Sequence, residues 1–263
     1  MTTQAVTTYD EAVDVRDGSW TVPDGWLQGR GSWGGLVVAG IVRAAAAADG
    51  RGLPLREVSV HMVGPLPSGH ASVATTLVRQ GSATSVWQVC VAGKETWAVG
   101  TVVFGGSRAA GFSPMVDLAM PPAPEWATCD VVAIGPPIAP EFLQHMALRP
   151  ICGLPYSGGA DPVMAWLAPT QPPVAYDAGL LVGLIDALWP ASLVQATTPR
   201  PMATLSFSAT LLVDPATVDP KVPLLHRGCL LDYVDGYATE SRELWTADGR
   251  LAVHNTQVIT VIK

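Results

Sequence analysis

Asp186 is the residue whose surroundings are least usual for its chemistry. It lies in a predicted helix over 178–189, in which the residues before it, GLLVGLI, and after it, ALW, leave almost no polar face. A helix that is apolar all round is normally buried, and a buried carboxylate is costly unless it is hydrogen-bonded. Such a group is kept either for structure, bonded to a neighbouring strand or a buried water, or for chemistry as a general base.

Two polar residues further along the chain are candidates to act with it. Gln257 lies in a predicted strand over 250–262, and its amide can both donate to and accept from a water. A cross-strand hydrogen bond with Asn255 or another neighbour explains Gln257 equally well. In the predicted strand over 202–213, alternation puts Leu205 on the apolar face and Thr204 with Ser206 on the other. Taken alone, Thr204 is an ordinary strand residue, because threonine suits strands.

Other catalytic patterns do not fit their context. The G-x-G-x-x-G at 29–34 opens a predicted helix, but antiparallel strands follow it, which argues against a dinucleotide site. The absence of G-x-S-x-G argues against a serine hydrolase. The histidines show neither H-E-x-x-H nor a close ligand pair, so we expect no metal and no other cofactor.

Composition narrows the class of partner. The formal net charge is −7, and no basic run is longer than two residues, which argues against nucleic acid. The most apolar run, 36–48, is short and interrupted by Arg43, so we expect no membrane span. The first 17 residues lack the pattern of a secretory signal. Four scattered cysteines without C-x-x-C suggest a reduced, cytoplasmic setting.

The same order of elements is predicted twice. In the first half, 20–28 forms a short strand, 34–48 a helix, and 55–63, 71–79, 84–92 and 96–104 strands separated by glycine turns. In the second half, the helix over 178–189 precedes strands over 202–213, 224–233, 237–246 and 250–262. Between them, 105–173 holds 13 of the 23 prolines, with apolar islands at 142–148 and 163–167 that we expect to be strands. We therefore expect a first unit over 1–105, a linker over 106–140 and a second unit over 141–263.

A long apolar helix followed by long antiparallel strands, used twice, resembles the hotdog fold, and the chain resembles the type II acyl-CoA thioesterases, which fuse two hotdog units. The matching segments are Gly31-Ser32-Trp33-Gly34-Gly35, Leu184-Ile185-Asp186, Met202-Ala203-Thr204-Leu205 and Asn255-Thr256-Gln257-Val258. The resemblance covers nearly the whole chain except its proline-rich middle. It implies an α+β double hotdog, in which each tandem unit has a long central helix wrapped by a curved antiparallel sheet.

The resemblance also implies a reaction and its residues. In that group an Asp, a Thr and a Gln hold the attacking water, which implies that Asp186, Thr204 and Gln257 are catalytic here. The implied activity is hydrolysis of acyl-CoA in fatty acid metabolism. The positions that loosely match Asp186 and Gln257 in the first half are Ile41 and Val102, both apolar, so one site is expected.

The start of the first helix supplies the remaining candidates. Backbone N–H groups of Gly34 and Gly35 are natural donors to the oxyanion of a tetrahedral intermediate, because the first turn of a helix leaves them without partners. Trp33 stands where many relatives carry a histidine. We expect it to line the substrate pocket or to be a core aromatic.

Two other functions remain open. The first is a non-catalytic acyl-CoA-binding protein, which Trp33 favours. The second is an enoyl or hydroxyacyl thioester hydratase or dehydratase, whose chemistry usually needs a carboxylate–histidine pair. His254 is the only histidine near Asp186 or Gln257 in the sequence, and it should face away from Gln257. The polar strand faces are either solvated or packed against another copy in a homo-oligomer.

Overall fold

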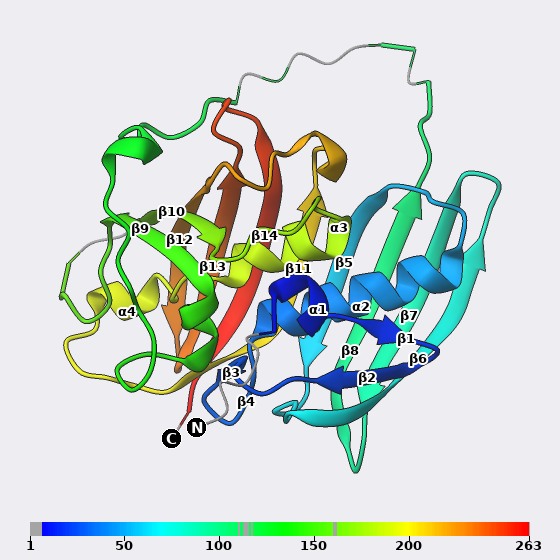
Figure 1. Ribbon diagram of the computed structural model, residues 1–263, viewed down its shortest axis with the longest axis horizontal. Helices are drawn as coiled ribbons and strands as arrows, with labels where there is room; N and C mark the ends of the chain where they lie inside the picture. The colour runs from blue at the N-terminus through cyan, green and yellow to red at the C-terminus, as the bar shows by residue number, and fades with distance from the viewer. Residues whose placement is uncertain (1–6, 110, 113–115, 117, 160–161, 263) are drawn as a thin grey trace.

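The computed structural model describes residues 7–262 apart from 110, 113–115, 117 and 160–161. In this part of the chain, the helices α2 (Gly34–Asp49) and α3 (Ala178–Gly183) lie side by side on one face of a large antiparallel sheet (Figure 1). Shorter helices are α1 (Tyr9–Ala12) and α4 (Ser192–Gln195), and 3₁₀ turns cover Trp126–Thr128, Glu141–His145, Leu184–Asp186 and Pro215–Thr217. No helix among the described residues is long and apolar enough to cross a membrane.

The strands come in two groups along the chain. The first group is β1 (Val15–Arg16), β2 (Ser19–Val22), β3 (Leu27–Gln28), β4 (Gly31–Ser32), β5 (Leu55–Met62), β6 (Gly69–Gln80), β7 (Thr84–Ala92) and β8 (Thr96–Gly105). The second is β9 (Met146–Cys152), β10 (Val163–Pro169), β11 (Met202–Leu211), β12 (Leu224–Val234), β13 (Tyr237–Trp245) and β14 (Leu251–Val261). The described residues form a 12-stranded sheet in the order β1-β2-β6-β7-β8-β5-β11-β14-β13-β12-β10-β9, and β3 pairs with β4 alone.

The two groups of strands meet at one seam. Strand β5 pairs antiparallel with β11, so that Val58 lies opposite Ala209 and Val60 opposite Phe207. These four side chains are buried on the face that the helices cover, where strand alternation places every second residue. The seam makes the two halves one continuous sheet.

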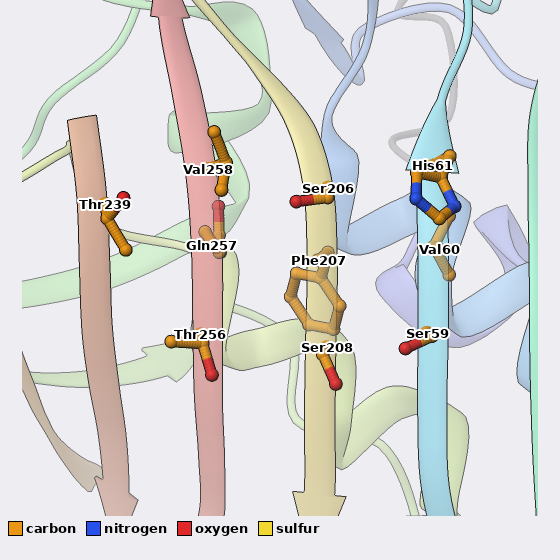
Figure 2. Close-up of a pocket in the computed structure, with 10 residues that line it drawn as sticks. All are labelled: Ser59, Val60, His61, Ser206, Phe207, Ser208, Thr239, Thr256, Gln257 and Val258. Carbon is orange, nitrogen blue, oxygen red and sulfur yellow. The ribbon is translucent and has the colours of Figure 1, made fainter. Parts of the chain in front are cut away.

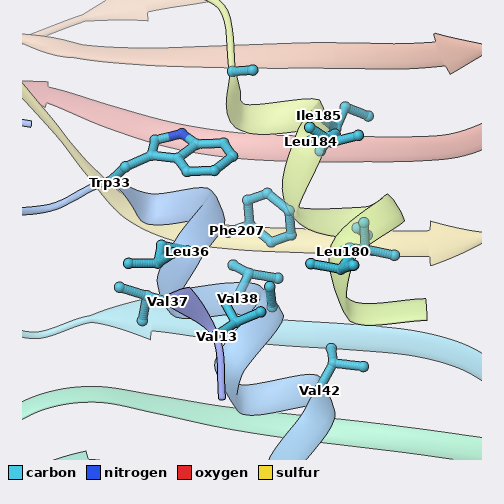
Figure 3. Packing of buried hydrophobic residues seen from close by; sticks show 14 of the residues in the cluster. Val13, Trp33, Leu36, Val37, Val38, Val42, Leu180, Leu184, Ile185 and Phe207 are labelled. Carbon is cyan, nitrogen blue, oxygen red and sulfur yellow. The ribbon is translucent and has the colours of Figure 1, made fainter. Parts of the chain in front are cut away.

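The two faces of the sheet differ in polarity. At the seam, the face away from the helices carries Ser59, His61, Ser206 and Ser208, which border a depression of about 230 Å³ over β5, β11, β14 and β13 (Figure 2). The covered face instead contributes Phe207 to a core that it shares with Val38 and Leu180 of the two helices (Figure 3). Chemistry that needs a dry environment is therefore confined to the helix side of the sheet.

Helix α2 is close to the sequence prediction. Its alanine-rich second half consists of the strongest helix-forming residue. Gly50 follows it with a φ of 63°, and its N–H donates to the Ala46 carbonyl oxygen. This left-handed residue ends the helix in the manner that favours glycine.

The second predicted helix is wrong in its C-terminal part. Asp177 caps its N-terminus, since the Asp177 side chain accepts the N–H of Leu180. After Gly183, however, the chain tightens into the 3₁₀ turn that ends at Asp186. Pro190 has no N–H to donate to the Asp186 carbonyl four residues before it, but the α-helix already ends at Gly183, before that bond.

Glycines allow α2 and α3 to cross in close contact. A Cβ added at Gly179 would lie 2.8 Å from the Ala39 carbonyl oxygen, and one added at Gly183 would collide with the carbonyl oxygen of Gly35. The pairing of 35 with 183 and of 39 with 179 shows that the helices run antiparallel. The N-terminus of α2 is thereby placed beside the C-terminal end of α3.

Most strand predictions hold within a few residues, with two exceptions. The strand predicted over 20–28 is wrong, because the chain between β2 and β3 turns at Pro23 and at Gly25, whose φ is 87°. The island at 142–148 is partly wrong, since Glu141–His145 forms a 3₁₀ turn and only then does β9 begin. The island at 163–167 is β10.

Candidate active site

The carboxylate of Asp186 lies at the end of the turn that follows α3 and is 7% exposed. Its Oδ1 accepts two hydrogen bonds, from Gln257 Nε2 at 2.9 Å and from Arg242 Nη1 at 3.1 Å. Its Oδ2 lies beside Gly34, where an added Cβ would come within 2.7 Å of that oxygen. The side chain predicted to be buried is therefore buried, and it is held from two strands.

Thr204 is joined to the same network. Its Oγ1 donates to Gln257 Oε1 at 3.1 Å, which produces a chain of hydrogen bonds from Thr204 through Gln257 to Asp186. Gln257 is almost fully buried, and Thr204 is partly exposed. The structure thus brings together the three residues that the resemblance implied.

A β-bulge makes this contact possible and corrects the sequence analysis. Alternation placed Thr204 on the same face as Ser206, away from Phe207. In the structure Thr204 lies opposite Ile259 and Ser206 opposite Val258, so Leu205 is an extra residue in β11. A bulge shifts the alternation by one residue, and it turns Thr204 toward the helix side, where Gln257 lies.

A cross-strand hydrogen bond of Gln257 is present, as the alternative explanation expected, but its partner is Thr204 of β11 and not Asn255. Asn255 is fully buried, and its Nδ2 donates to the backbone carbonyls of Ser208 and Thr256. Gln257 instead uses both ends of its amide within the site.

Arg242 and Glu240 are site residues that the sequence analysis missed. Both are buried on β13, and Arg242 bridges Asp186 and Glu240, with contacts of 3.1 Å to each carboxylate. The free oxygen of Glu240, Oε1, accepts the N–H of Ser192 at 3.1 Å. A signal was present, because Ala238, Glu240, Arg242 and Leu244 share one face of a predicted strand, and a charged pair between apolar positions is unusual there.

Opposing effects act on the ionisation of Asp186. Burial, the largest effect, raises the pKa of its carboxyl above the ordinary value, because a charged group loses its hydration. The charge of Arg242 and hydrogen bonds from Gln257 and the backbone N–H of Gly35 lower it, and the charge of Glu240 raises it. The net direction is upward, which is the direction that makes a carboxylate a better proton acceptor.

The N-terminus of α2 borders the carboxylate directly. Gly34 and Gly35 lie in the first helical turn, where N–H groups have no carbonyl partner within the helix. The Gly35 N–H is already directed to Asp186. Of the two expected oxyanion donors, only Gly34 is thus left without this competing bond.

Trp33 is a core aromatic residue in this structure. It is fully buried, and its indole Nε1 donates to the backbone carbonyl of Asp186 at 2.9 Å. Its ring stacks on Phe142 with a centroid distance of 4.9 Å, and Tyr9 and Trp26 lie close by. Trp33 therefore fixes the turn that carries the carboxylate, in the place where Pro190 prevents a helical bond.

The histidine that contacts the turn of Asp186 is His226 and not His254, which is nearer to Gln257 in the sequence. His254 is exposed on the outer face and lies 3.1 Å from Ser241, in agreement with the prediction that it faces away from Gln257. His226 is fully buried, and its Nε2 lies 2.9 Å from the carbonyl oxygen of Ile185. Burial and the charge of Arg242 lower its pKa to about 3, so its ring is neutral at pH 7.

Among the described residues of the first half, the positions that correspond to this network are apolar. Strand β5 carries a matching irregularity, with Leu55 opposite Phe104 and Glu57 opposite Val103, so Leu55 corresponds to Thr204. Leu55, Ile41 and Val102 are all buried and apolar. Hydrocarbon fills the pseudo-equivalent site.

Two other kinds of site, the outer depression and a metal centre, are alternatives to the site at Asp186. The depression of Figure 2 is lined by Gln257 but not by Asp186, and the serine, threonine and histidine side chains around it lie on the face away from the helices. In the described part of the chain, no three His, Cys, Asp or Glu side chains are grouped so that they could hold a metal ion.

Solved structures with the same fold come from several bacteria. A conserved protein of unknown function with a hot dog fold from Alicyclobacillus acidocaldarius is 23% identical, with a TM-score of 0.86, and 97% of this chain aligns with 98% of that one. A putative thioesterase II from Thermobifida fusca YX is 22% identical, with 99% of both chains covered and a TM-score of 0.82. The acyl-CoA thioesterase II TesB2 from Mycobacterium marinum is 15% identical, with 87% and 88% covered and a TM-score of 0.70. These similarities show a shared hotdog fold.

The sequence itself carries the family relationship. A comparison with curated proteins gives no match. Residues 22–105 match the acyl-CoA thioesterase N-terminal domain, and residues 115–261 match the acyl-CoA thioesterase C-terminal domain. The second match covers more than half of the chain, and it contains Asp186, Thr204 and Gln257. The chain therefore belongs to the acyl-CoA thioesterase family.

Proposed function

We propose that this protein hydrolyses an acyl-CoA thioester to a carboxylic acid and free CoA, with Asp186 as the general base. Family membership supports thioester hydrolysis in general. The observation that carries the specific proposal is the hydrogen-bond chain from Thr204 through Gln257 to Asp186. It ends at a buried carboxylate of raised pKa beside a helix N-terminus.

Each polar group has a defined task in this proposal. Gln257 Nε2 uses one hydrogen for Asp186 and has a second available for a water, since an amide nitrogen carries two donors. The hydroxyl oxygen of Thr204 can accept from the same water while it donates to Gln257. Holding the water in one orientation removes much of the entropic cost of the attack.

The proposed reaction has two steps, addition of water to the carbonyl carbon and loss of the thiolate. The water oxygen bonds to the carbonyl carbon while its proton passes to Asp186, and the carbonyl electron pair moves onto oxygen. The intermediate then re-forms its C=O bond and breaks the C–S bond. The leaving thiolate takes the proton back from Asp186, which restores the enzyme.

The oxyanion of the intermediate needs preorganised donors. The N–H of Gly34, in the first turn of α2, is the proposed donor, and the positive end of the helix dipole adds to its effect. Gly35 is assigned to Asp186 instead, because its N–H already bonds that carboxylate. The site then combines α2 of the first half with the carboxylate, amide and hydroxyl of the second.

We also propose a double hotdog arrangement, in which residues 1–105 and 141–263 are the two units and 106–140 links them. The repeated order of helix and strands and the β5–β11 seam support it. The apolar residues Leu55, Ile41 and Val102 at the pseudo-equivalent position support a single site per chain.

A non-catalytic acyl-CoA-binding protein is the second candidate. The specific observation in its favour is that Asp186 already accepts bonds from Arg242, Gln257 and Gly35, as a structural carboxylate does. A hydratase has less support, because His226 bonds the Ile185 backbone and not the carboxylate.

Thiol release from a panel of saturated and unsaturated acyl-CoAs tests the proposal. We expect the wild type to release CoA and Asp186→Asn to lose nearly all of that activity. Asp177→Asn is the matched control, because Asp177 lies near the other end of the same segment and asparagine also caps a helix well. Binding of acyl-CoA without release supports the second candidate, and hydration of an enoyl-CoA supports a hydratase. Equal activity of wild type and Asp186→Asn would rule out Asp186 as the base.

A further inference from the structure

Two carboxylates and one guanidinium lie together in the core behind the candidate site. Asp186, Arg242 and Glu240 are 7%, 2% and 0% exposed in their side chains, and they carry a formal charge of −1 together. Buried ion pairs add little to stability, because the loss of hydration offsets their attraction. A buried group of this kind therefore calls for an explanation other than stability.

The positions that correspond to Glu240 and Arg242 in the first half carry uncharged residues. Across β13 and β14, Glu240 lies opposite Gln257 and Arg242 opposite Asn255. Across β7 and β8, Trp87 lies opposite Val102 and Val89 opposite Gly100, so Val89 occupies the position of Arg242. Val89 is fully buried. An uncharged residue thus satisfies the packing at that position where no carboxylate has to be held.

All three nitrogens of the Arg242 guanidinium donate hydrogen bonds to groups in the core. Nη1 donates to Asp186 Oδ1 at 3.1 Å and to the Leu188 carbonyl at 3.5 Å, and Nε and Nη2 donate to Glu240 Oε2 at 3.3 and 3.1 Å. Glu240 is held in turn by the backbone N–H and hydroxyl of Ser192. Because the guanidinium is a rigid planar fork, this set leaves Asp186 Oδ1 no freedom to turn.

We propose that Arg242, anchored by Glu240, is a positioning residue that engages Oδ1 of Asp186 so that Oδ2 faces the attacking water beside Gly34. This inference rests on the proposed function and adds to it a residue pair outside the Asp–Thr–Gln chain. The charge of Arg242 lowers the pKa of Asp186 against the larger effect of burial, and the charge of Glu240 raises it, so the pair sets how basic the carboxylate is.

Few other titratable groups face Asp186. Tyr9 of α1 lies near it, and burial raises the pKa of its phenol well above the ordinary value, so it is neutral. His226 of β12 is neutral, with a pKa of about 3. The charges acting on Asp186 from the elements around it are therefore those of Arg242 and Glu240 on β13.

Substitutions of Arg242 and Glu240 should shift the pH dependence of activity in opposite directions, and this tests the proposal. Arg242→Met removes a positive charge next to Asp186, so the acid limb of the pH profile of kcat/KM should move up by about one pH unit or more. Glu240→Gln leaves the Arg242 charge uncompensated, so the same limb should move down. In Arg242→Met we also expect kcat to fall about 100-fold with little change in KM, because an oriented carboxylate is lost. Glu240→Gln preserves the shape of the side chain, so its downward shift of the acid limb can still be measured if Arg242→Met does not fold.

Two controls separate this role from a structural one. Arg227→Met removes an arginine of the neighbouring strand β12 that pairs with Glu243 at 3.6 Å and is 39% exposed, and it should leave the profile unchanged. Arg242→Lys keeps a charge but not the fork, so it should retain the acid limb while kcat falls. A purely structural role would lower the active fraction of all variants without moving the limb in opposite directions.

The pKa of Asp186 can also be read directly, by ¹³C NMR of its carboxyl carbon with Asp186→Asn for assignment. If the wild type hydrolyses no thioester, the proposed function fails, yet the NMR titration still tests the two partners. An Asp186 pKa that rises in Arg242→Met and falls in Glu240→Gln supports the inference. Unchanged values, or shifts in the same direction, would overturn it even in an active enzyme.

Discussion

His226 allows a test of the packing behind the candidate carboxylate that requires no substrate. Its Nε2 donates to the Ile185 carbonyl oxygen, and its Nδ1 has no partner among the described atoms. Burial and the charge of Arg242 depress its pKa from 6.5 to about 3. The folded protein therefore keeps this ring neutral between those values, whereas the unfolded chain takes up a proton below pH 6.5.

The sign and size of the effect follow from this difference. Because the folded pKa is depressed, the stability that His226 contributes is fully present above pH 6.5 and is lost as the pH falls toward 3. Each pH unit in that window corresponds to about 1.4 kcal/mol. Between pH 7 and pH 5 the free energy of unfolding should therefore fall by about 2 kcal/mol on account of this residue.

Urea unfolding at pH 7, 6 and 5 measures this loss. His226→Gln keeps a donor for the Ile185 carbonyl but does not titrate, so its free energy of unfolding should fall by about 2 kcal/mol less than that of the wild type. His254→Gln removes an exposed histidine and should keep the wild-type dependence on pH. If wild type and His226→Gln lose stability equally between pH 7 and pH 5, the inference that the buried His226 ring stays neutral is refuted.

Three further outcomes are expected. Gln257→Ala should lower kcat about 100-fold, because the water loses its orientation. Asn255→Ala removes a buried amide on the same face and should lower the free energy of unfolding as much as Gln257→Ala does, by about 1–3 kcal/mol, with kcat nearly kept. Thiol release and urea unfolding separate the two effects, and equal losses of kcat in both variants would make Gln257 structural. Gly183→Ala should destabilise by about 3 kcal/mol, since its Cβ collides with the first turn of α2, whereas Gly106→Ala meets nothing closer than 3.6 Å; similar urea midpoints would contradict the close helix crossing. The free energy of unfolding of Asp186→Asn relative to the wild type should rise with pH. The reason is that the raised pKa of Asp186 makes the stability from its protonation present at low pH and lost as the pH rises through the folded pKa. A difference between the two proteins in urea unfolding that does not grow with pH would count against the raised pKa.

Local signals predicted the elements that carry the site. Glycine turns separate the long alternating strands, and Asp177 and Gly50 mark the start of one helix and the end of the other. The burial of Asp186 followed from its apolar neighbours alone. Pro190 directly follows the predicted helix, yet the α-helix ends at Gly183, earlier than its hydrophobic pattern indicated.

Register and long-range pairing could not be predicted in this way. The bulge at Leu205 depends on how β11 pairs with β14, and no glycine marks it, so alternation placed Thr204 on the wrong face. Alternation could have placed Glu240 and Arg242 on the buried face. That Arg242 meets a carboxylate 56 residues before it is a property of the folded sheet and not of either segment.

The seam between β5 and β11 has a consequence for how this chain can be divided. Separated from its partner, either half would present a full-length unpaired strand, the kind of edge that invites aggregation. Val58 and Val60 on one side, and Phe207 and Ala209 on the other, would be at that open edge. Truncation at the linker should therefore yield two aggregation-prone fragments instead of two independently folded proteins.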